Sequence, residues 1–186
     1  MKAIESYKMF DPTKLDRALP PEQPGNYIFL LRPCVMLPED MISSQPTFST
    51  LMYDGKNYDV LYIGKTSSSL YERVFETHLF GNNAGWSTLR KSLGSLWGYP
   101  FICRDKNPKP GKKVKTKFRD DDEKAITLWM KQNLLVLVAP NANFDKDESE
   151  MIAVFNPPLN LKKNHNAINY SYRKKIEELR ERPIEG

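Results

Sequence analysis

Two tyrosines lie in apolar stretches of the kind that form buried strands. Tyr27 opens one such stretch, and Tyr62 lies in another that runs into Gly64 and Lys65. A phenol with a pKa of about 10 is a poor base at neutral pH. A tyrosine that accepts a proton therefore needs a nearby cation or a hydrogen bond to lower its pKa. Lys65 and His78 are the candidates for that effect.

Three further residues complete a set that suits phosphodiester hydrolysis. That reaction requires an aligned water, a proton acceptor, cations that neutralise the charge of the transition state and usually a divalent metal. Arg73 and Glu148 lie on two predicted helices, and Asn160 follows Glu148 by twelve residues. The chain therefore contains residues of each required type.

Taken in order, these residues resemble the motifs of the GIY-YIG nuclease superfamily. The two tyrosines occupy the positions that name the family. Glu148, the apolar helix after it, Pro157 and Asn160 resemble its terminal motif. The resemblance covers most of residues 22–162 and implies a DNA endonuclease.

The resemblance also implies a role for each residue. Tyr27 would be the general base toward water, and Tyr62 would act at the phosphate or in a proton relay. Arg73 would grip the scissile phosphate with two N–H groups, and Lys65 would lie at the mouth of the site. Asn160 would brace the metal-side carboxylate or the first tyrosine through a hydrogen bond.

The cofactor implied by the resemblance is a single Mg²⁺ or Mn²⁺ on Glu148. Such a hard cation accepts one carboxylate, waters and phosphate oxygens as ligands. Glu150 is the alternative ligand, but the two side chains point about 200° apart on a helix, so both cannot fill the same role. In a purely structural interpretation, Glu148 only stabilises the start of its helix.

Two positions depart from the family pattern. Asn26 stands where the family usually has an apolar residue, which affects packing more than chemistry. His78 follows Arg73 by five residues, whereas a spacing of four places two side chains on one face of an α-helix. Either the helix contains an irregular turn, or His78 is a cap or packing residue outside the site. Arg73 could also form a surface ion pair, and 157–160 could be a plain helix stop.

Buried strands are expected to hold the two tyrosines. Residues 26–32 form a continuous apolar run, the pattern of a strand buried on both faces. Asp54-Gly55 between two apolar runs indicates a tight hairpin, although Lys56-Asn57 could lengthen its turn. A further buried strand is expected at 134–138. These strands predict a small, mainly antiparallel sheet.

Helices are expected to flank this sheet. Their predicted ranges are 11–19, 67–80, 87–97, 120–132, 145–155 and 170–182. The fold class is therefore α/β of the α+β type, a small mainly antiparallel β-sheet flanked by helices, as in GIY-YIG nucleases. We divide the chain into an N-terminal helical extension (1–21), a nuclease-like domain (22–162) and a polar C-terminal helix (163–186).

Basic residues outside the motifs are candidates for contact with DNA. The stretch 81–94 feeds a helix start, a good arrangement for a backbone phosphate. Lysines are dense at 106–117 and recur at Lys162-Lys163, where they could follow a duplex electrostatically. The alternatives are an ordinary capped helix and solvated charges. The predicted contacts are Ser87, Arg90, Lys91, Lys112, Lys113 and Lys115.

The composition suits a cytoplasmic protein with one main domain. The 28 basic and 23 acidic residues give a net charge of +5, which suits a polyanion without requiring one. Cys34 and Cys103 are too few for a disulfide framework or a cysteine-rich zinc site, so we expect reduced thiols. The sequence shows no signal peptide and no apolar run of about 20 residues that would span a membrane.

The leading hypothesis is a metal-dependent DNA endonuclease. One rival is a catalytically inactive module of the same fold that binds nucleic acid. Another is a protein whose basic surfaces serve protein or RNA contacts. A nuclease this compact would recognise DNA through its loops, with a separate recognition partner, or as a homodimer.

Overall fold

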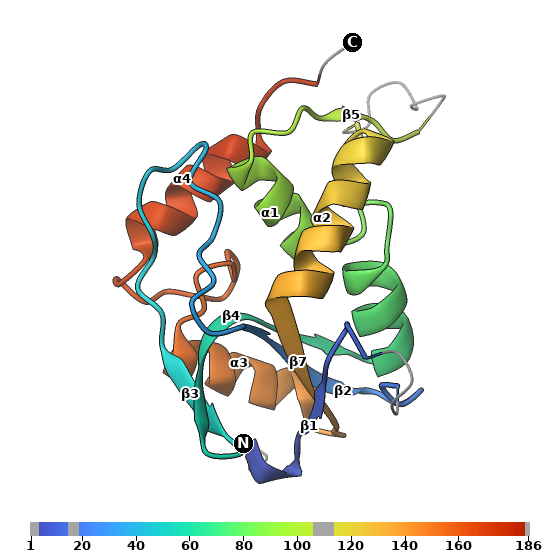
Figure 1. The fold of residues 1–186 in the computed structure, drawn as a ribbon, viewed down its shortest axis with the longest axis vertical. Helices are drawn as coiled ribbons and strands as arrows, with labels where there is room; N and C mark the ends of the chain where they lie inside the picture. Colours follow the sequence, from blue (N-terminus) through green and yellow to red (C-terminus); the bar gives the residue numbers. More distant parts are fainter. Residues whose placement is uncertain (1–3, 15–18, 106–113, 185–186) are drawn as a thin grey trace.

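A computed structural model describes residues 4–14, 19–105 and 114–184. Its centre is a five-stranded antiparallel sheet with strand order β1-β7-β2-β4-β3 (Figure 1). A two-stranded hairpin lies apart from it. The strands are β1 Lys8–Phe10, β2 Gly25–Leu31, β3 Thr50–Tyr53, β4 Lys56–Thr66, β5 Ile102–Cys103, β6 Thr116–Lys117 and β7 Leu134–Pro140.

Helices cover both faces of the large sheet, as predicted. They are the 3₁₀ helix η1 Ile4–Ser6, the π-helix η2 Tyr71–Leu79, α1 Thr88–Leu96, α2 Asp120–Asn133, α3 Phe144–Phe155 and α4 Tyr170–Arg180. Helix α3 lies on one side of the sheet, and α1, α2 and α4 lie on the other (Figure 1). None of these helices, within the described residues, is long and apolar enough to cross a membrane.

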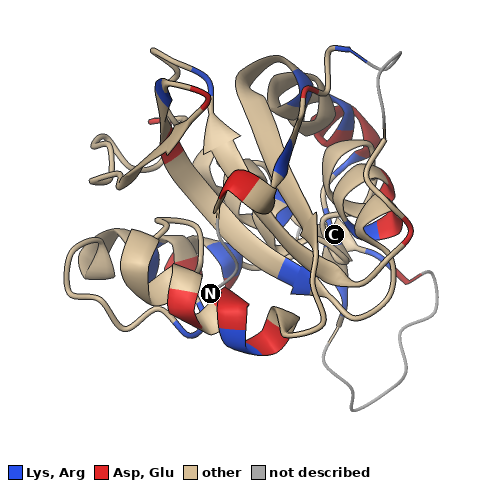
Figure 2. Ribbon diagram, turned by 90° about the horizontal axis from the view of Figure 1, so that it is seen from below, with Lys and Arg blue, Asp and Glu red and all other residues tan. Residues whose placement is uncertain are grey.

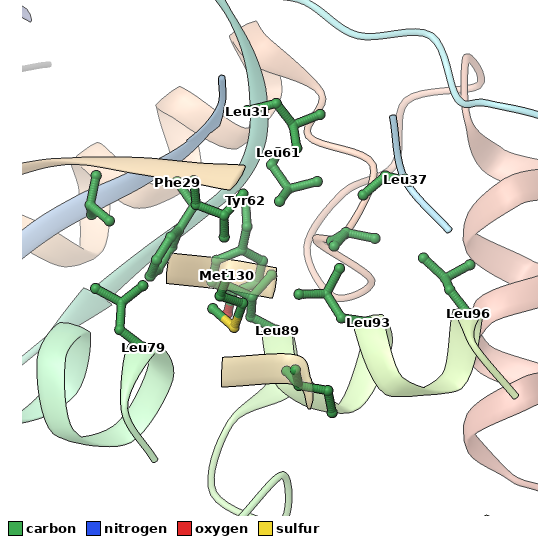
Figure 3. Packing of buried hydrophobic residues seen from close by; sticks show 14 of the residues in the cluster. Phe29, Leu31, Leu37, Leu61, Tyr62, Leu79, Leu89, Leu93, Leu96 and Met130 are labelled. Atoms are coloured by element: carbon green, nitrogen blue, oxygen red, sulfur yellow. The ribbon is translucent and has the colours of Figure 1, made fainter. Parts of the chain in front are cut away.

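Strand β2 is buried over its whole length because helices cover both of its faces. Phe29 belongs to the larger core, which includes Leu89 and Leu93 of α1 (Figure 3). Ile28, one residue before Phe29, packs in the smaller core with Met151 of α3. Alternate residues of one apolar run thus serve two cores, which is why the run shows no polar alternation.

The hairpin between β3 and β4 forms at Asp54-Gly55. Both residues have positive φ, 49° and 70°, and Tyr53 pairs directly with Lys56. This is the pattern of a two-residue type I′ turn, whose backbone twist matches that of the strands it joins. Lys56-Asn57 therefore belongs to β4 and does not lengthen the turn.

Strand β1 and helix α4, the first strand and the last helix described, both pack on the central core. Phe10 of β1 and Tyr172 and Ile176 of α4 belong to the same buried cluster as Phe29. Strand β1 was not predicted, because it has three residues and only one of them is buried.

Two other predicted segments are described only in part. Of the predicted helix 11–19, residues 11–14 contain a turn, in which Asp11 accepts hydrogen bonds from Thr13, and 15–18 lie outside the described residues. Of the lysine-rich segment, 116–117 form β6. Cys34 and Cys103 are both free thiols, as expected.

Candidate active site

The ring of Tyr27 lies across the neighbouring strand because a glycine faces it. Tyr27 of β2 pairs with Gly64 of β4. A Cβ atom on Gly64 would lie 2.4 Å from both Cζ and the hydroxyl oxygen of Tyr27. Any other residue at this position would displace the ring, so Gly64 is required by close approach.

Tyr62 lies beside Tyr27 because its partner across the strands, Phe29, follows Tyr27 by two residues on the same face, and a β-bulge comes directly after this pair. Phe29 pairs with Tyr62, but Leu30 pairs with Val60, so β4 carries one extra residue at Leu61. The rings of Tyr27 and Tyr62 are nearly parallel, with centroids 6.4 Å apart. Tyr62 is buried near Phe29 and Met130 (Figure 3).

Arg73 and His78 meet at the Tyr27 hydroxyl because η2 is wound as a π-helix. In a π-helix each N–H donates to the carbonyl five residues earlier, as in the 2.9 Å bond from the Phe80 N–H to the Phe75 carbonyl. This winding brings residues five apart onto one face. Arg73 Nε lies 3.3 Å, and His78 Nε2 2.9 Å, from the Tyr27 hydroxyl. Of the two alternatives left open by the five-residue spacing, the irregular turn is the one present.

His78 is buried and links Tyr27 to the start of α1. Its Nδ1 lies 2.6 Å from Ser87 Oγ, which also accepts the Arg90 backbone N–H as the cap of α1. Burial and the nearby charges of Arg73 and Arg90 hold the pKa of His78 well below its usual 6.5. The imidazole is therefore neutral at physiological pH.

Burial is also the largest influence on the pKa of the two tyrosines, which corrects the expectation that nearby cations lower it. It raises the pKa of Tyr27 above its usual value, against the opposing effect of Arg73. It likewise raises the pKa of Tyr62, although a hydrogen bond with Thr88 and the charges of Arg73 and Arg180 act in the opposite direction. Lys65 and His78 do not lower either pKa as predicted, and both tyrosines are phenols in the free protein.

Glu148 lies on α3 between two lysines. Its Oε2 is 3.2 Å from Lys163 Nζ and 3.7 Å from Lys65 Nζ, and 13% of its side chain is exposed. Lys65 is also paired with Asp145. Glu148 also acts electrostatically on both site tyrosines, raising the pKa of each. Glu150 pairs instead with Lys146 at 3.8 Å on the helix surface.

The donor set around Glu148 fits a metal held by one carboxylate. Within 4–14, 19–105 and 114–184 there is no cluster of three His, Cys, Asp or Glu residues that could enclose an ion. A partly exposed carboxylate suits Mg²⁺ or Mn²⁺, which keeps several waters and takes other ligands from phosphate. Such an ion would compete with Lys65 and Lys163 for the same oxygen.

Asn160 braces the main chain of β4, which corrects the predicted hydrogen bond to a carboxylate or tyrosine. Its side-chain amide donates to the Ile63 carbonyl and accepts from the Ile63 N–H, both at 2.8 Å. The Leu159 N–H also donates to the Leu61 carbonyl at 3.3 Å. The segment therefore satisfies the edge of β4 beyond the end of β3 and holds the backbone on both sides of Tyr62.

Asn26 anchors α3 to the sheet. Its side-chain amide donates to the Phe144 carbonyl at 2.9 Å and accepts from Asn141 at 2.7 Å. Asn141 also donates to Asp147 of α3 at 2.9 Å. The asparagine at this position thus contributes hydrogen bonds that fix the helix carrying Glu148, rather than apolar packing.

The family model for the GIY-YIG catalytic domain matches residues 25–182. The chain belongs to the GIY-YIG family. This is a nuclease-type family, and the match includes α4, which the sequence analysis had set apart as an addition. No curated protein and no solved structure matches the chain.

Two of the predicted DNA contacts in this GIY-YIG domain are wrong, because Ser87 and Arg90 are fully buried. Arg90 forms an ion pair with Glu123 at 2.8 Å. Its guanidinium also donates to the carbonyl of His78 at 3.1 Å and to Thr127 Oγ1 at 2.9 Å. It holds the end of η2 against α2 and cannot reach a phosphate.

The remaining predicted contacts have different surroundings. Lys91 donates to Thr116 Oγ1 at 2.9 Å and lies 4.8 Å from the centre of the Phe101 ring. Lys115 is exposed, whereas Lys112 and Lys113 lie outside the described residues. Acidic and basic positions are mixed over the ribbon rather than gathered in one basic stripe (Figure 2).

The sequence analysis missed three residues around this GIY-YIG site. Trp86 is 62% exposed, and its carbonyl accepts a 3.0 Å hydrogen bond from Arg73. Arg180 of α4 acts electrostatically on Tyr62. Lys163 had been interpreted only as part of a basic patch. Trp86 offered a sequence signal, a tryptophan within a polar glycine-rich turn, but Arg180 looked like one of many charges on a polar helix.

Proposed function

We propose that this GIY-YIG protein is a metal-dependent DNA endonuclease. The observation that carries the proposal is the environment of the Tyr27 hydroxyl. It lies within hydrogen-bond distance of a neutral imidazole and of a guanidinium, and Glu148 acts on it electrostatically. This arrangement combines a proton acceptor, a phosphate-binding cation and a metal-binding carboxylate, as phosphodiester hydrolysis requires.

The hydrogen bonds define a path for the proton. The Tyr27 oxygen accepts from Arg73, so its own buried proton needs another acceptor, and His78 Nε2 at 2.9 Å provides one. His78 Nδ1 then carries the ring proton and donates to Ser87. As Tyr27 takes a proton from the attacking water, it passes its own proton to His78, and hydroxide attacks the phosphorus. The ester P–O bond opposite the incoming oxygen breaks, and the sugar oxygen that leaves takes a proton from solvent water.

Substrate binding would make this relay more basic. In the free protein the charge of Arg73 lowers the pKa of His78, and the Arg73 side chain covers the Tyr27 hydroxyl. When Arg73 turns to the scissile phosphate, the phosphate neutralises part of that charge and the hydroxyl becomes accessible. Both effects favour proton transfer only when DNA is bound.

Glu148 would hold Mg²⁺ or Mn²⁺, which supplies positive charge against the transition state when bound. Lys65 and Lys163 already lie at this carboxylate. With a metal ion held by Glu148, these two lysines would be free to contact neighbouring phosphates of the same strand. Tyr62, beside Arg73, would orient the phosphate.

The test is cleavage of supercoiled plasmid by purified protein with Mg²⁺, with Mn²⁺ and with chelator. We expect metal-dependent cleavage that is lost in Tyr27→Phe, Arg73→Ala and Glu148→Ala. Glu150→Ala, a carboxylate on the same helix, is the matched control and should cleave normally. Nicked circles would indicate cleavage of one strand, and linear product would favour a homodimer or paired cuts.

The rival function is an inactive module that binds nucleic acid. It predicts that the plasmid is retained without cleavage, and that retention weakens with salt but does not depend on metal. Equal cleavage by all four variants and the parent would show that the residue roles proposed above are wrong.

A further inference from the structure

A groove of about 400 Å³ lies beside the candidate active site, between the turn before α1 and the β5–β6 hairpin. The described residues that line it include three cations and no carboxylate. These cations are Lys91, Arg104 and Lys115. Asp105 pairs with Arg104 Nε at 2.9 Å, but it is not part of the lining.

Trp86 is the prominent feature of this groove. Its side chain is largely exposed, and the guanidinium of Arg104 lies 4.6 Å from the centre of its ring. An aromatic ring beside a cation suits a flat group that carries negative charge nearby.

The turn that carries Trp86 is held in place. The Trp86 N–H donates to the Asn83 carbonyl at 3.1 Å, and the Gly85 N–H donates to Asn83 Oδ1 at 2.9 Å. A Cβ on Gly85 would lie 2.7 Å from the Thr116 carbonyl oxygen, so the glycine allows close approach to β6. The ring is thus presented on a fixed support.

The same turn connects the groove to Arg73, the proposed ligand of the scissile phosphate. The Trp86 carbonyl accepts a 3.0 Å hydrogen bond from Arg73 Nη1, and Arg73 Nε reaches Tyr27. A ligand that places one phosphate at Arg73 would therefore bring the neighbouring part of its chain to Trp86.

A second, larger hollow has a different lining, and the comparison helps to identify the ligand that would bind in the Trp86 groove. It measures about 620 Å³ along α4, and its lining carries both four cations, Lys91, Lys162, Lys174 and Arg180, and three glutamates, Glu177, Glu178 and Glu181. The glutamates offset most of that positive charge, and no aromatic side chain of the described residues lines this hollow. The Trp86 groove combines an exposed aromatic face with three cations, the features by which proteins bind single-stranded nucleic acid.

We propose that Trp86 is a stacking platform for an unpaired base of the DNA strand whose phosphate Arg73 binds. The substrate class is then DNA with unpaired bases, such as single strands, flaps or branched junctions. Bases inside an intact duplex have both faces covered by their neighbours and cannot stack on Trp86. This inference rests on the proposed function and specifies its substrate.

The test is a fluorescence titration in chelator, where no cleavage occurs. The chain has three tryptophans, and Trp97 and Trp129 are partly buried in the core, so stacking on Trp86 should quench the exposed emission. Single-stranded oligonucleotide should quench the parent, whereas duplex of the same sequence should quench it weakly. Trp86→Phe should bind with nearly parental affinity but without this quenching.

Trp86→Ala should weaken binding of the single strand by about 5- to 100-fold. Tyr170→Ala is the matched control, because Tyr170 is 55% exposed and also lies beneath a cation, Lys174 at 5.8 Å. It should change the affinity less than twofold. Thermal melting of each variant checks that the fold is intact.

Four results would overturn the inference: no quenching by single strands, unchanged affinity in Trp86→Ala, equal quenching by duplex, or equal loss in Tyr170→Ala. Cleavage provides an independent comparison. Normal plasmid cleavage without quenching by single strands would reject the platform alone. Quenching without metal-dependent cleavage of plasmid, single-stranded or branched DNA would reject the nuclease and leave a module that binds single strands.

Discussion

Two carboxylate and cation clusters in this protein differ in how completely they are enclosed. Arg90 and Glu123 are 0% and 1% exposed in their side chains and are paired at 2.8 Å. Glu123 also accepts the backbone N–H of Ala84 at 2.7 Å and that of Phe118 at 3.3 Å. The cluster is sealed, and its polar groups serve the fold.

The second cluster, around Glu148, is open. Lys163, one of its two lysines, has a side chain that is 55% exposed, and the separations of 3.2 and 3.7 Å leave room for exchange of partners. Cations near a carboxylate therefore do not by themselves indicate a functional site. The Glu148 cluster can exchange ligands because it is open to solvent and its carboxylate has room for other hydrogen bonds. The Arg90–Glu123 cluster has neither property.

Glu123→Ala should show the largest effect on stability. It leaves the buried Arg90 guanidinium without its carboxylate and should lower the free energy of unfolding by about 3–5 kcal/mol. Glu148→Ala, in the open cluster, should change it by less than about 1 kcal/mol. Urea denaturation of the two variants measures both values, and similar losses would remove the distinction drawn here.

Asn160→Ala should cause the next largest loss in the free energy of unfolding. It leaves the buried N–H and carbonyl of Ile63 unsatisfied, which should cost about 1–3 kcal/mol, and it loosens the backbone beside Tyr62. Denaturation measures the loss, with Asn57→Ala at the exposed end of the same strand as control. A normal stability in Asn160→Ala would mean that water replaces the side chain and that this edge of β4 is less enclosed than described.

The buried His78, next to Arg90 of the sealed cluster, should make the stability of the protein depend on pH. The pKa of His78 is well below its usual 6.5 because of burial, Arg73 and Arg90. Below about pH 6.5 the unfolded chain therefore binds a proton that the folded chain does not. The free energy of unfolding should fall as the pH falls, by at most about 1.4 kcal/mol per pH unit.

Denaturation between pH 5 and 8 checks this slope, since about pH 6.5 is where an unperturbed histidine titrates. His78→Gln should flatten it, whereas the exposed His165→Gln should keep it. A slope that persists in His78→Gln would have to come from other groups.

Lys163→Gln should have the smallest effect, and it should be a gain: a higher affinity for the metal. It removes an ammonium that competes with a metal for Glu148. Since an exposed pair contributes about 0.2–1 kcal/mol, Mn²⁺ should bind about 1.4- to 5-fold more tightly. Calorimetric titration measures this, with Lys146→Gln, which removes the partner of Glu150, as control. Weaker binding would show that Lys163 supports the metal site.

The sequence predicted the elements whose signals are local. Asp54-Gly55 specified the hairpin, and the apolar runs specified β2 and β7, because turn chemistry and burial act on neighbouring residues. The five-residue spacing of Arg73 and His78 was a local sign of irregular winding. It could not show whether the π-helix would form, since that depends on what holds its end.

Contacts between distant residues could not be predicted in this way. Arg90 looked like a phosphate ligand because its partner, Glu123, lies 33 residues away on another helix. The partner of Asn160 is the main chain of Ile63, which has no sequence signature at all. The tyrosine pKa values also differed from expectation, because burial by several elements outweighs any single neighbouring charge.

The contact between Gly64 and Tyr27 links the correct register of β2 and β4 to the assembly of the candidate active site. If β4 slipped by two residues against β2, each side chain would keep its face of the sheet, but Tyr62 or Thr66 would lie beneath the Tyr27 ring. With a Cβ only 2.4 Å from that ring, neither could be accommodated. A misaligned sheet therefore cannot close around the tyrosine, and any molecule that completes its core has also assembled its hydroxyl relay.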